Sequence, residues 1–295
     1  MVAEKRGSSA NRLSTVLARQ LGSQLLAFRD AAGLNQSAAA EVLSAQAAKV
    51  AKMERGWVPF RDPDIIALCK LYGVEDEAVV ASLVRLAKLD RERRRAKGWW
   101  NALDQNNLRE YIAMEDAASL VRTWQLSFIP GLFQTREYAR SLAVSEGAWI
   151  DPDEIERIVE VRMKRQARLD GEHPLEVYAV VWEAALRQQV GSPEVMRGQM
   201  EHLLDMAELP NVRLQVLPYR SGGHPCMANA FNIVSFAEAE SVDVVHVDTI
   251  TSTLWVENEE DSSVYSTFFD RTARKSLAPK DSVSLIESIG KGMHS

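Results

Sequence analysis

The sequence predicts two domains of different fold class, a mainly α-helical domain followed by an α+β domain. Apolar residues recur at helical spacing through five short segments within about the first hundred residues. Strand-like segments begin only later and are mixed with helices. A chain of 295 residues is long enough for two domains that each bury a core. We expect a flexible tail over 1–14, a helical domain over 15–97 and an α+β domain over 98–295.

The helical domain is predicted from its apolar spacing and its helix stops. The predicted helices cover residues 15–32, 34–43, 46–54, 62–72 and 75–97. Gly33 and Gly73 follow the first and fourth helices as stops, and Asp62 before Pro63 is typical of a helix start with Asp62 as the N-cap. The fifth helix begins amphipathic and ends in a basic stretch. Five short helices in succession predict a compact helical domain.

The second part alternates irregularly between the two kinds of element. We expect helices over 107–123, 153–170, 193–209, 260–277 and 280–289, and strands over 175–182, 212–217, 231–236 and 242–247. Because helices and strands do not alternate one for one, this order favours an α+β domain over a doubly wound sheet.

The two parts carry opposite net charge. Residues 1–98 contain 17 Lys and Arg against 11 Asp and Glu, and the remainder contains 18 against 30. This asymmetry suits a first domain that binds phosphate and a second that avoids nucleic acid, although surface charge also varies between domains without such a role.

The sequence favours a cytoplasmic protein. No apolar run approaches the roughly 20 residues that cross a bilayer, and the first residues lack the apolar stretch of a secretion signal. Cys69 and Cys226 are the only cysteines, which argues against a disulfide framework and fits a reducing compartment. We therefore expect no contact with a membrane.

Residues 34–56 have the form of a helix-turn-helix, in which a short helix braces a second one whose exposed side can enter the major groove. Val50 and Met53 are expected to point inward. Lys49 and Lys52 then supply charge to guanine edges or phosphates, and Gln36 is placed to hold a phosphate oxygen. The predicted DNA-binding residues are Gln36, Gln46, Ala47, Ala48, Lys49, Lys52 and Arg55.

The helix-turn-helix also carries a family resemblance. The runs Leu34-Asn35-Gln36, Lys49-Val50 and Met53-Glu54-Arg55-Gly56 resemble the Cro/repressor-like (XRE-type) motif that opens many actinobacterial regulators. The resemblance covers about residues 18–73. That family usually has Thr before the Gln and begins its recognition helix with Ser and Gln. This chain has Asn35, and then Gln46, Ala47 and Ala48, so its set of base-reading side chains is small.

The remainder resembles the C-terminal domain of the Scr1-like, antitoxin-like regulators, a group similar to WhiJ. Matching stretches include Gly98-Trp99-Trp100, Ile129-Pro130-Gly131-Leu132, Tyr138-Ala139-Arg140, Gly223-His224-Pro225 and 245–248. The resemblance implies a transcription factor that works with a small acidic partner protein, often encoded nearby. The sequence itself identifies no partner.

Signs of catalysis are weak. The chain has no phosphate-binding loop, no dinucleotide fingerprint and no Gly-x-Ser-x-Gly elbow. His224-Pro225-Cys226 is the one place where a histidine lies close to a cysteine, and zinc needs three or four ligands. We expect that loop to be structural, and we expect no enzyme activity, cofactor or metal. The tryptophans of the second domain, from Trp99 to Trp255, belong more often to a core than to a ligand pocket.

Together these observations favour a sequence-specific, DNA-binding transcription regulator. We expect a repressor that is controlled through its C-terminal domain by a small partner protein. Because one such motif contacts few base pairs, we expect a homodimer that binds two half-sites of double-stranded DNA. Two alternatives remain, a protein-interaction scaffold with a vestigial helix-turn-helix and a regulator that senses a small molecule.

Overall fold

The computed structural model describes residues 15–95, 98–99, 106–146, 152–237, 242–249 and 252–293. The predicted tail, 1–14, lies outside these residues. Contacts between residues divide the chain into two compact units, here called the N-terminal unit (Met1–Ala113) and the C-terminal unit (Met114–Ser295). This division falls later along the chain than the predicted boundary at 97/98.

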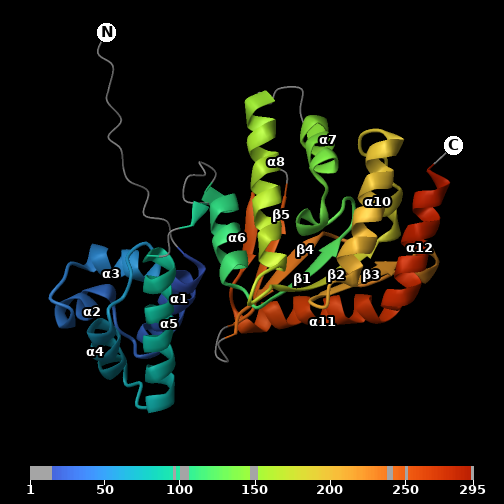
Figure 1. Cartoon of the computed structure of the whole chain (residues 1–295). Helices are drawn as coiled ribbons and strands as arrows, with labels where there is room; N and C mark the ends of the chain where they lie inside the picture. Colours follow the sequence, from blue (N-terminus) through green and yellow to red (C-terminus); the bar gives the residue numbers. More distant parts are fainter. Residues whose placement is uncertain are drawn as a thin grey trace, which may run out of the picture. The chain divides into compact units, whose positions relative to one another are not determined.

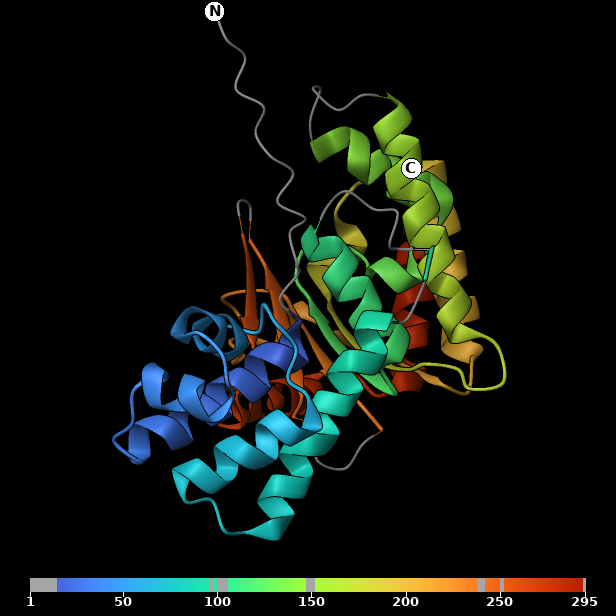
Figure 2. The same ribbon diagram turned by 90° about the vertical axis from the view of Figure 1, so that its left-hand side faces the viewer.

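The N-terminal unit is helical, as predicted (Figures 1 and 2). Its helices are α1 (Val16–Ala31), α2 (Gln36–Val42), α3 (Ala47–Glu54), α4 (Asp62–Tyr72) and α5 (Glu77–Arg95), and α6 (Asn106–Ala117) crosses the division between the units. Leu21 and Leu25 of α1 share one core with Val50 and Met53 of α3 and with Leu83 of α5. The predicted helical class of this unit is confirmed.

The start of α4 differs from the prediction in one detail. Arg61 is the N-cap, and Asp62 is the first residue of the helix. The Asp64 carboxylate accepts a hydrogen bond from the Arg61 backbone amide at 3.4 Å. The Asp62 carboxylate instead accepts one from Nη2 of Arg91 at 2.6 Å, so an interaction with α5 takes the place of the expected cap.

In the C-terminal unit, the described residues form a six-stranded mixed sheet in the order β3-β2-β1-β4-β5-β6. The strands are β1 (Leu120–Gln125), β2 (Glu176–Trp182), β3 (Val212–Leu217), β4 (Phe231–Ser235), β5 (Val244–Asp248) and β6 (Thr253–Val256). β1 pairs with β2 in parallel, as β2 does with β3, whereas the other pairs are antiparallel. This arrangement confirms the α+β class.

Helices cover both faces of the sheet. The helices of this unit after α6 are α7 (Arg136–Glu146), α8 (Pro152–Gln166), α9 (Glu183–Arg187), α10 (Pro193–Glu208), α11 (Glu259–Lys275) and α12 (Pro279–Gly292), with short 3-10 turns at Gly131–Phe133, Ala167–Leu169 and Tyr219–Ser221. Figure 1 shows α11 along one face and α8 and α10 over the other.

The structure differs from the sequence prediction at two strands and one helix. The helix expected over 107–123 ends at Ala117, and its last part is the strand β1. Val121 and Trp124 point to opposite faces of β1 and are both buried, which is typical of a central strand. The short edge strand β6 was not predicted, and neither was α7.

The face of the sheet that carries α11 holds an apolar core. Trp124 of β1 and Phe269 of α11 are fully buried there, and the Trp124 indole donates a hydrogen bond to the Cys226 carbonyl at 2.8 Å. Trp124 thus belongs to the core, as expected for most of the tryptophans. Trp100 and Trp149 lie outside the described residues.

A buried histidine lies in the strand β5. His246 is 5% exposed, and its Nε2 lies 3.3 Å from the Asp248 carboxylate. Burial lowers the pKa of His246 to about 4, although Asp248 acts in the opposite direction. The imidazole is therefore neutral at neutral pH in the folded protein.

This histidine predicts an acid-sensitive stability. An unfolded histidine titrates near pH 6.5. Because the folded pKa is lower, the unfolded state binds more protons below that pH, and stability falls as the pH is lowered toward 4. The loss is on the order of 3 kcal/mol. Denaturation with urea at several pH values should show that His246→Gln lacks this part of the pH dependence. The exposed His173→Gln should retain it, and identical profiles for wild type and His246→Gln would contradict the assignment.

Candidate DNA-contacting surface

The turn between α2 and α3 sets the angle between the two helices. Ser44 has a φ of +47°, in the left-handed region. The amide of Ala45 donates to the Ala40 carbonyl at 2.9 Å, and that of Ser44 donates to the Glu41 carbonyl at 3.0 Å. These bonds end α2 and lead the chain directly into α3.

The inner side of α3 is anchored against α1. Val50 and Met53 are 2% and 0% exposed, which confirms their predicted inward direction. A Cβ atom built on Gly22 of α1 would lie 2.2 Å from the backbone oxygen of Glu54. Only glycine therefore lets the α1 backbone come this close to the carboxyl end of α3.

The outer side of α3 presents most of the predicted contact residues to solvent. Gln46, the N-cap, is exposed, and so are Ala48, Lys49, Lys52 and Arg55. Ala47 is half-buried and packs against the hydrophobic core, so it contributes less to this surface than the others.

Two lysines dominate the charge of this side. Lys49 and Lys52 are three residues apart and therefore lie on the same side of the helix. Among the described residues, neither lysine forms an ion pair. The Arg55 guanidinium lies 5.5 Å from the centre of the Trp57 ring. Lys49 and Lys52 thus offer positive charge that no acidic side chain among the described residues neutralises.

A buried polar network holds α1, α2 and α3 together. The Glu54 carboxylate accepts hydrogen bonds from Nε of Arg29 at 2.7 Å and from Nε2 of Gln36 at 2.7 Å. Nη1 of Arg29 also donates to the Leu34 carbonyl at 2.6 Å. The side chains of Arg29 and Glu54 are 9% and 6% exposed, and the hydrogen bond with Glu54 raises the pKa of Arg29.

This network gives Gln36 a structural contact that the sequence did not indicate. Gln36 was predicted to contact phosphate. In the folded unit its side-chain amide donates a hydrogen bond to the Glu54 carboxylate. Sequence reasoning also missed Arg29 and Glu54. The one signal in the sequence was the position of Glu54 within the motif that carries the family resemblance.

Two arginines near the end of α5, Arg91 and Arg94, make contacts within the unit. Nη2 of Arg91 pairs with Asp62 at 2.6 Å, and Arg94 pairs with Asp90 at 2.8 Å and donates to the Gly56 carbonyl at 2.9 Å. These arginines hold the segment 56–62 against α5. The positive charges of Arg91 and Arg94 are therefore engaged within the unit, which the count of basic residues alone did not indicate.

The loop His224-Pro225-Cys226 contacts α11 through its cysteine. Cys226 is buried, and its sulfur accepts a hydrogen bond from the Thr272 hydroxyl at 3.2 Å. Within the described ranges, no group of three or more His, Cys, Asp or Glu side chains could hold a metal ion. No helix in those ranges is long and apolar enough to span a membrane.

Comparison with protein families gives two matches. Residues 20–83 match a family described as a helix-turn-helix domain, which contains the α2–α3 pair described above. Residues 108–288 match a family described as a domain of unknown function (DUF5753). No curated protein and no solved structure matches the chain.

Proposed function

Because the chain belongs to the DUF5753 family and carries a helix-turn-helix domain typical of DNA-binding regulators, we propose that it is a sequence-specific transcription repressor. In this proposal the helix-turn-helix is of the XRE type, and the C-terminal domain is antitoxin-like and similar to that of WhiJ, as the sequence resemblance implies. DNA is contacted by the exposed side of α3.

The observation that carries this proposal is the division of α3 into two sides. One side is buried on Val50 and Met53, and the other presents Lys49 and Lys52 without ion pairs among the described residues. A helix held this firmly by its inner side can enter the major groove without rearrangement. Lys49 lies nearer the amino end of α3, where side chains meet base edges. Lys52 lies in the last turn of α3, where we expect it to contact a phosphate.

The proposal includes a homodimer that binds two half-sites about one helical turn apart. Footprinting on the promoter of the protein's own gene should protect both half-sites. A footprint of one half-site, together with a monomer by light scattering, would contradict the dimer.

The two lysines are expected to act differently. Lys49→Ala should cost about 1 to 3 kcal/mol of binding free energy on the operator and weaken the preference at one base position. Lys52→Ala should lower affinity alike on all sequences and reduce the slope of affinity against salt concentration by about one. Fluorescence anisotropy on operator and scrambled duplexes at several salt concentrations measures both effects.

Lys88→Ala is the matched control, because Lys88 is an exposed lysine of α5, which packs on α1 and α4. It should leave affinity nearly unchanged. An unchanged affinity in the Lys49→Ala, Lys52→Ala double variant would overturn the assignment of α3.

The proposal assigns binding and no catalysis to the chain, and it places the protein in the cytoplasm with the DNA it regulates. Control passes through the C-terminal unit, and the resemblance supports a small acidic partner protein encoded nearby. Repeating the footprint with the product of a neighbouring small acidic reading frame tests this control. Protection that is the same with and without that product would count against it.

A further inference from the structure

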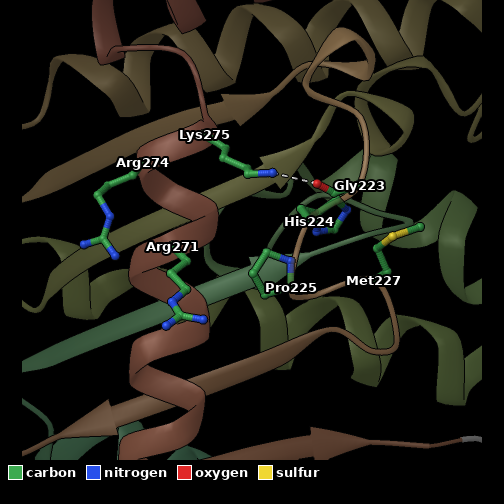
Figure 3. A pocket seen from close by; sticks show the side chains of 7 residues that line it. All are labelled: Gly223, His224, Pro225, Met227, Arg271, Arg274 and Lys275. Carbon is green, nitrogen blue, oxygen red and sulfur yellow. Dashed lines mark hydrogen bonds between the residues drawn. The ribbon is translucent and has the colours of Figure 1, made fainter.

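The C-terminal unit contains an open hollow of about 630 Å³ that the proposed function does not use (Figure 3). One wall is the loop that contains Gly223, His224, Pro225 and Met227. The other wall is the end of α11, with Arg271, Arg274 and Lys275. This volume lies within the range of sites that bind small molecules.

The charged part of the lining is entirely cationic. No acidic residue lines the hollow, although the remainder of the chain after residue 98 carries 30 acidic against 18 basic residues. Among the described residues, Arg271 and Arg274 form no ion pair. The negative carbonyl end of α11 favours cations in its last turn, but it offers no bidentate partner for a guanidinium.

Arg271 and Lys275 lie one helical turn apart on α11. Figure 3 shows Lys275 reaching toward the loop, Arg271 on the near face of the helix with its guanidinium directed along the helix, and Arg274 on the flank away from the loop. Nζ of Lys275 donates to the Gly223 carbonyl at 2.8 Å and thereby ties the helix to the loop. An ammonium has three donors, so Lys275 keeps hydrogen-bonding capacity for a ligand.

The loop is shaped by glycine. Gly222 has a φ of +64° and a ψ of −149°, a conformation that L side chains rarely adopt. A Cβ atom built on Gly223 would meet no other atom within 4 Å. The backbone of the loop is thus open on the side of Gly223, where a ligand could approach it closely.

The opposite part of the lining is suited to an apolar group. The His224 ring lies edge-on against Trp124 at 5.0 Å between ring centres and 6.3 Å from the centre of Trp182. Its Nδ1 is buried without a hydrogen-bond partner among the described residues. Burial, and then Lys275, lowers the pKa of His224, so the ring is neutral at neutral pH. Met227, 65% exposed, and Pro225 complete an uncharged surface.

We propose that this hollow binds a small organic anion, a carboxylate or phosphate ester carried on an apolar body. Arg271 and Lys275 hold the anionic group, and His224 and Met227 contact the body. The binding itself is independent of the proposed function. Control of DNA binding by such a ligand would rest on the proposed function.

Isothermal titration calorimetry on the full chain, without DNA, tests the proposal with phenyl phosphate, benzoate and benzylamine. We expect the two anions to bind and the cation of similar size not to bind. The double variant Arg271→Gln, Lys275→Gln should weaken binding of phenyl phosphate at least about tenfold, equivalent to a change of about 1.4 kcal/mol. His224→Ala should weaken phenyl phosphate more than inorganic phosphate, because it removes contacts with the body alone.

The matched control is Arg157→Gln, Lys291→Gln, which removes the same charge from exposed positions of α8 and α12. It should leave affinity unchanged. An equal loss in the control would show attraction by diffuse charge and overturn the site. The absence of heat with both anions at about 10 mM, a concentration that reveals even weak binding, would also overturn it. In that case the cationic lining would instead suit an acidic side chain of a protein partner. Neither result bears on the footprint, since no DNA is present.

Discussion

Replacing Glu54 with alanine is expected to lower the free energy of unfolding of the N-terminal unit by about 3 to 5 kcal/mol. The substitution leaves the Arg29 guanidinium, only 9% exposed, without its buried counter-charge, and it removes the partner of Gln36. Urea denaturation of the full chain, followed by helical circular dichroism, measures the loss. Binding to the operator should fall with it, because α3 loses its link to α1 and α2.

Asp30 provides a control on the same guanidinium. Its carboxylate lies 2.9 Å from Nη1 of Arg29 but is 63% exposed. Asp30→Ala should therefore change stability little, since exposed ion pairs contribute little. Equal losses in Asp30→Ala and Glu54→Ala would show that burial is not the source of the effect.

Glu115→Ala is expected to have an effect of the same size on the C-terminal unit, about 3 to 5 kcal/mol. Arg165 binds Glu115 with two parallel hydrogen bonds of 2.8 and 2.7 Å, and the two side chains are 10% and 1% exposed. Removing the carboxylate leaves a guanidinium buried beneath the helices that cover the sheet. Thermal and urea unfolding, followed by tryptophan fluorescence, should report the change.

The pair Arg140 and Glu156 is the matched control for Glu115. It has the same two-bond geometry, at 2.8 Å each, between α7 and α8, but both side chains are about half exposed. Glu156→Ala should be nearly neutral, because water replaces the lost contacts. If Glu156→Ala proved as harmful as Glu115→Ala, the helix packing rather than the buried charge would carry the stability.

The helices of the N-terminal unit could be predicted because local signals and burial agree there. Leucines about four residues apart in α1 are the residues that the core buries, and Gly33 and Gly73 stand where helices end. By contrast, 120–125 looks like a continuation of α6 when only spacing is considered. It is a strand because β2 and β4 pair with it on both sides, and those partners are distant in sequence. The edge strand β6 is too short to show a pattern of its own.

The same distinction applies to the candidate sites. The exposure of Lys49 and Lys52 follows from helical spacing once Val50 points inward, so the sequence could predict it. The contact between Gln36 and Glu54 depends on how three helices pack, and no local pattern encodes it. The hollow joins the loop at 223–227 to the end of α11, and only the fold brings these two segments together.

The path of the chain through the sheet has a consequence for the order of folding. Leu120, at the start of β1, pairs with Ser235 at the end of β4, so the centre of the sheet requires residues that are synthesised much later. Loop closure over such separations is slow, whereas the contacts among α1 to α5 join segments that are closer together in the sequence and form earlier. On the ribosome, the helical unit can therefore be complete while the strands of the second unit still lack their partners. Exposed strand edges in that interval make the second unit the part that most needs protection from aggregation.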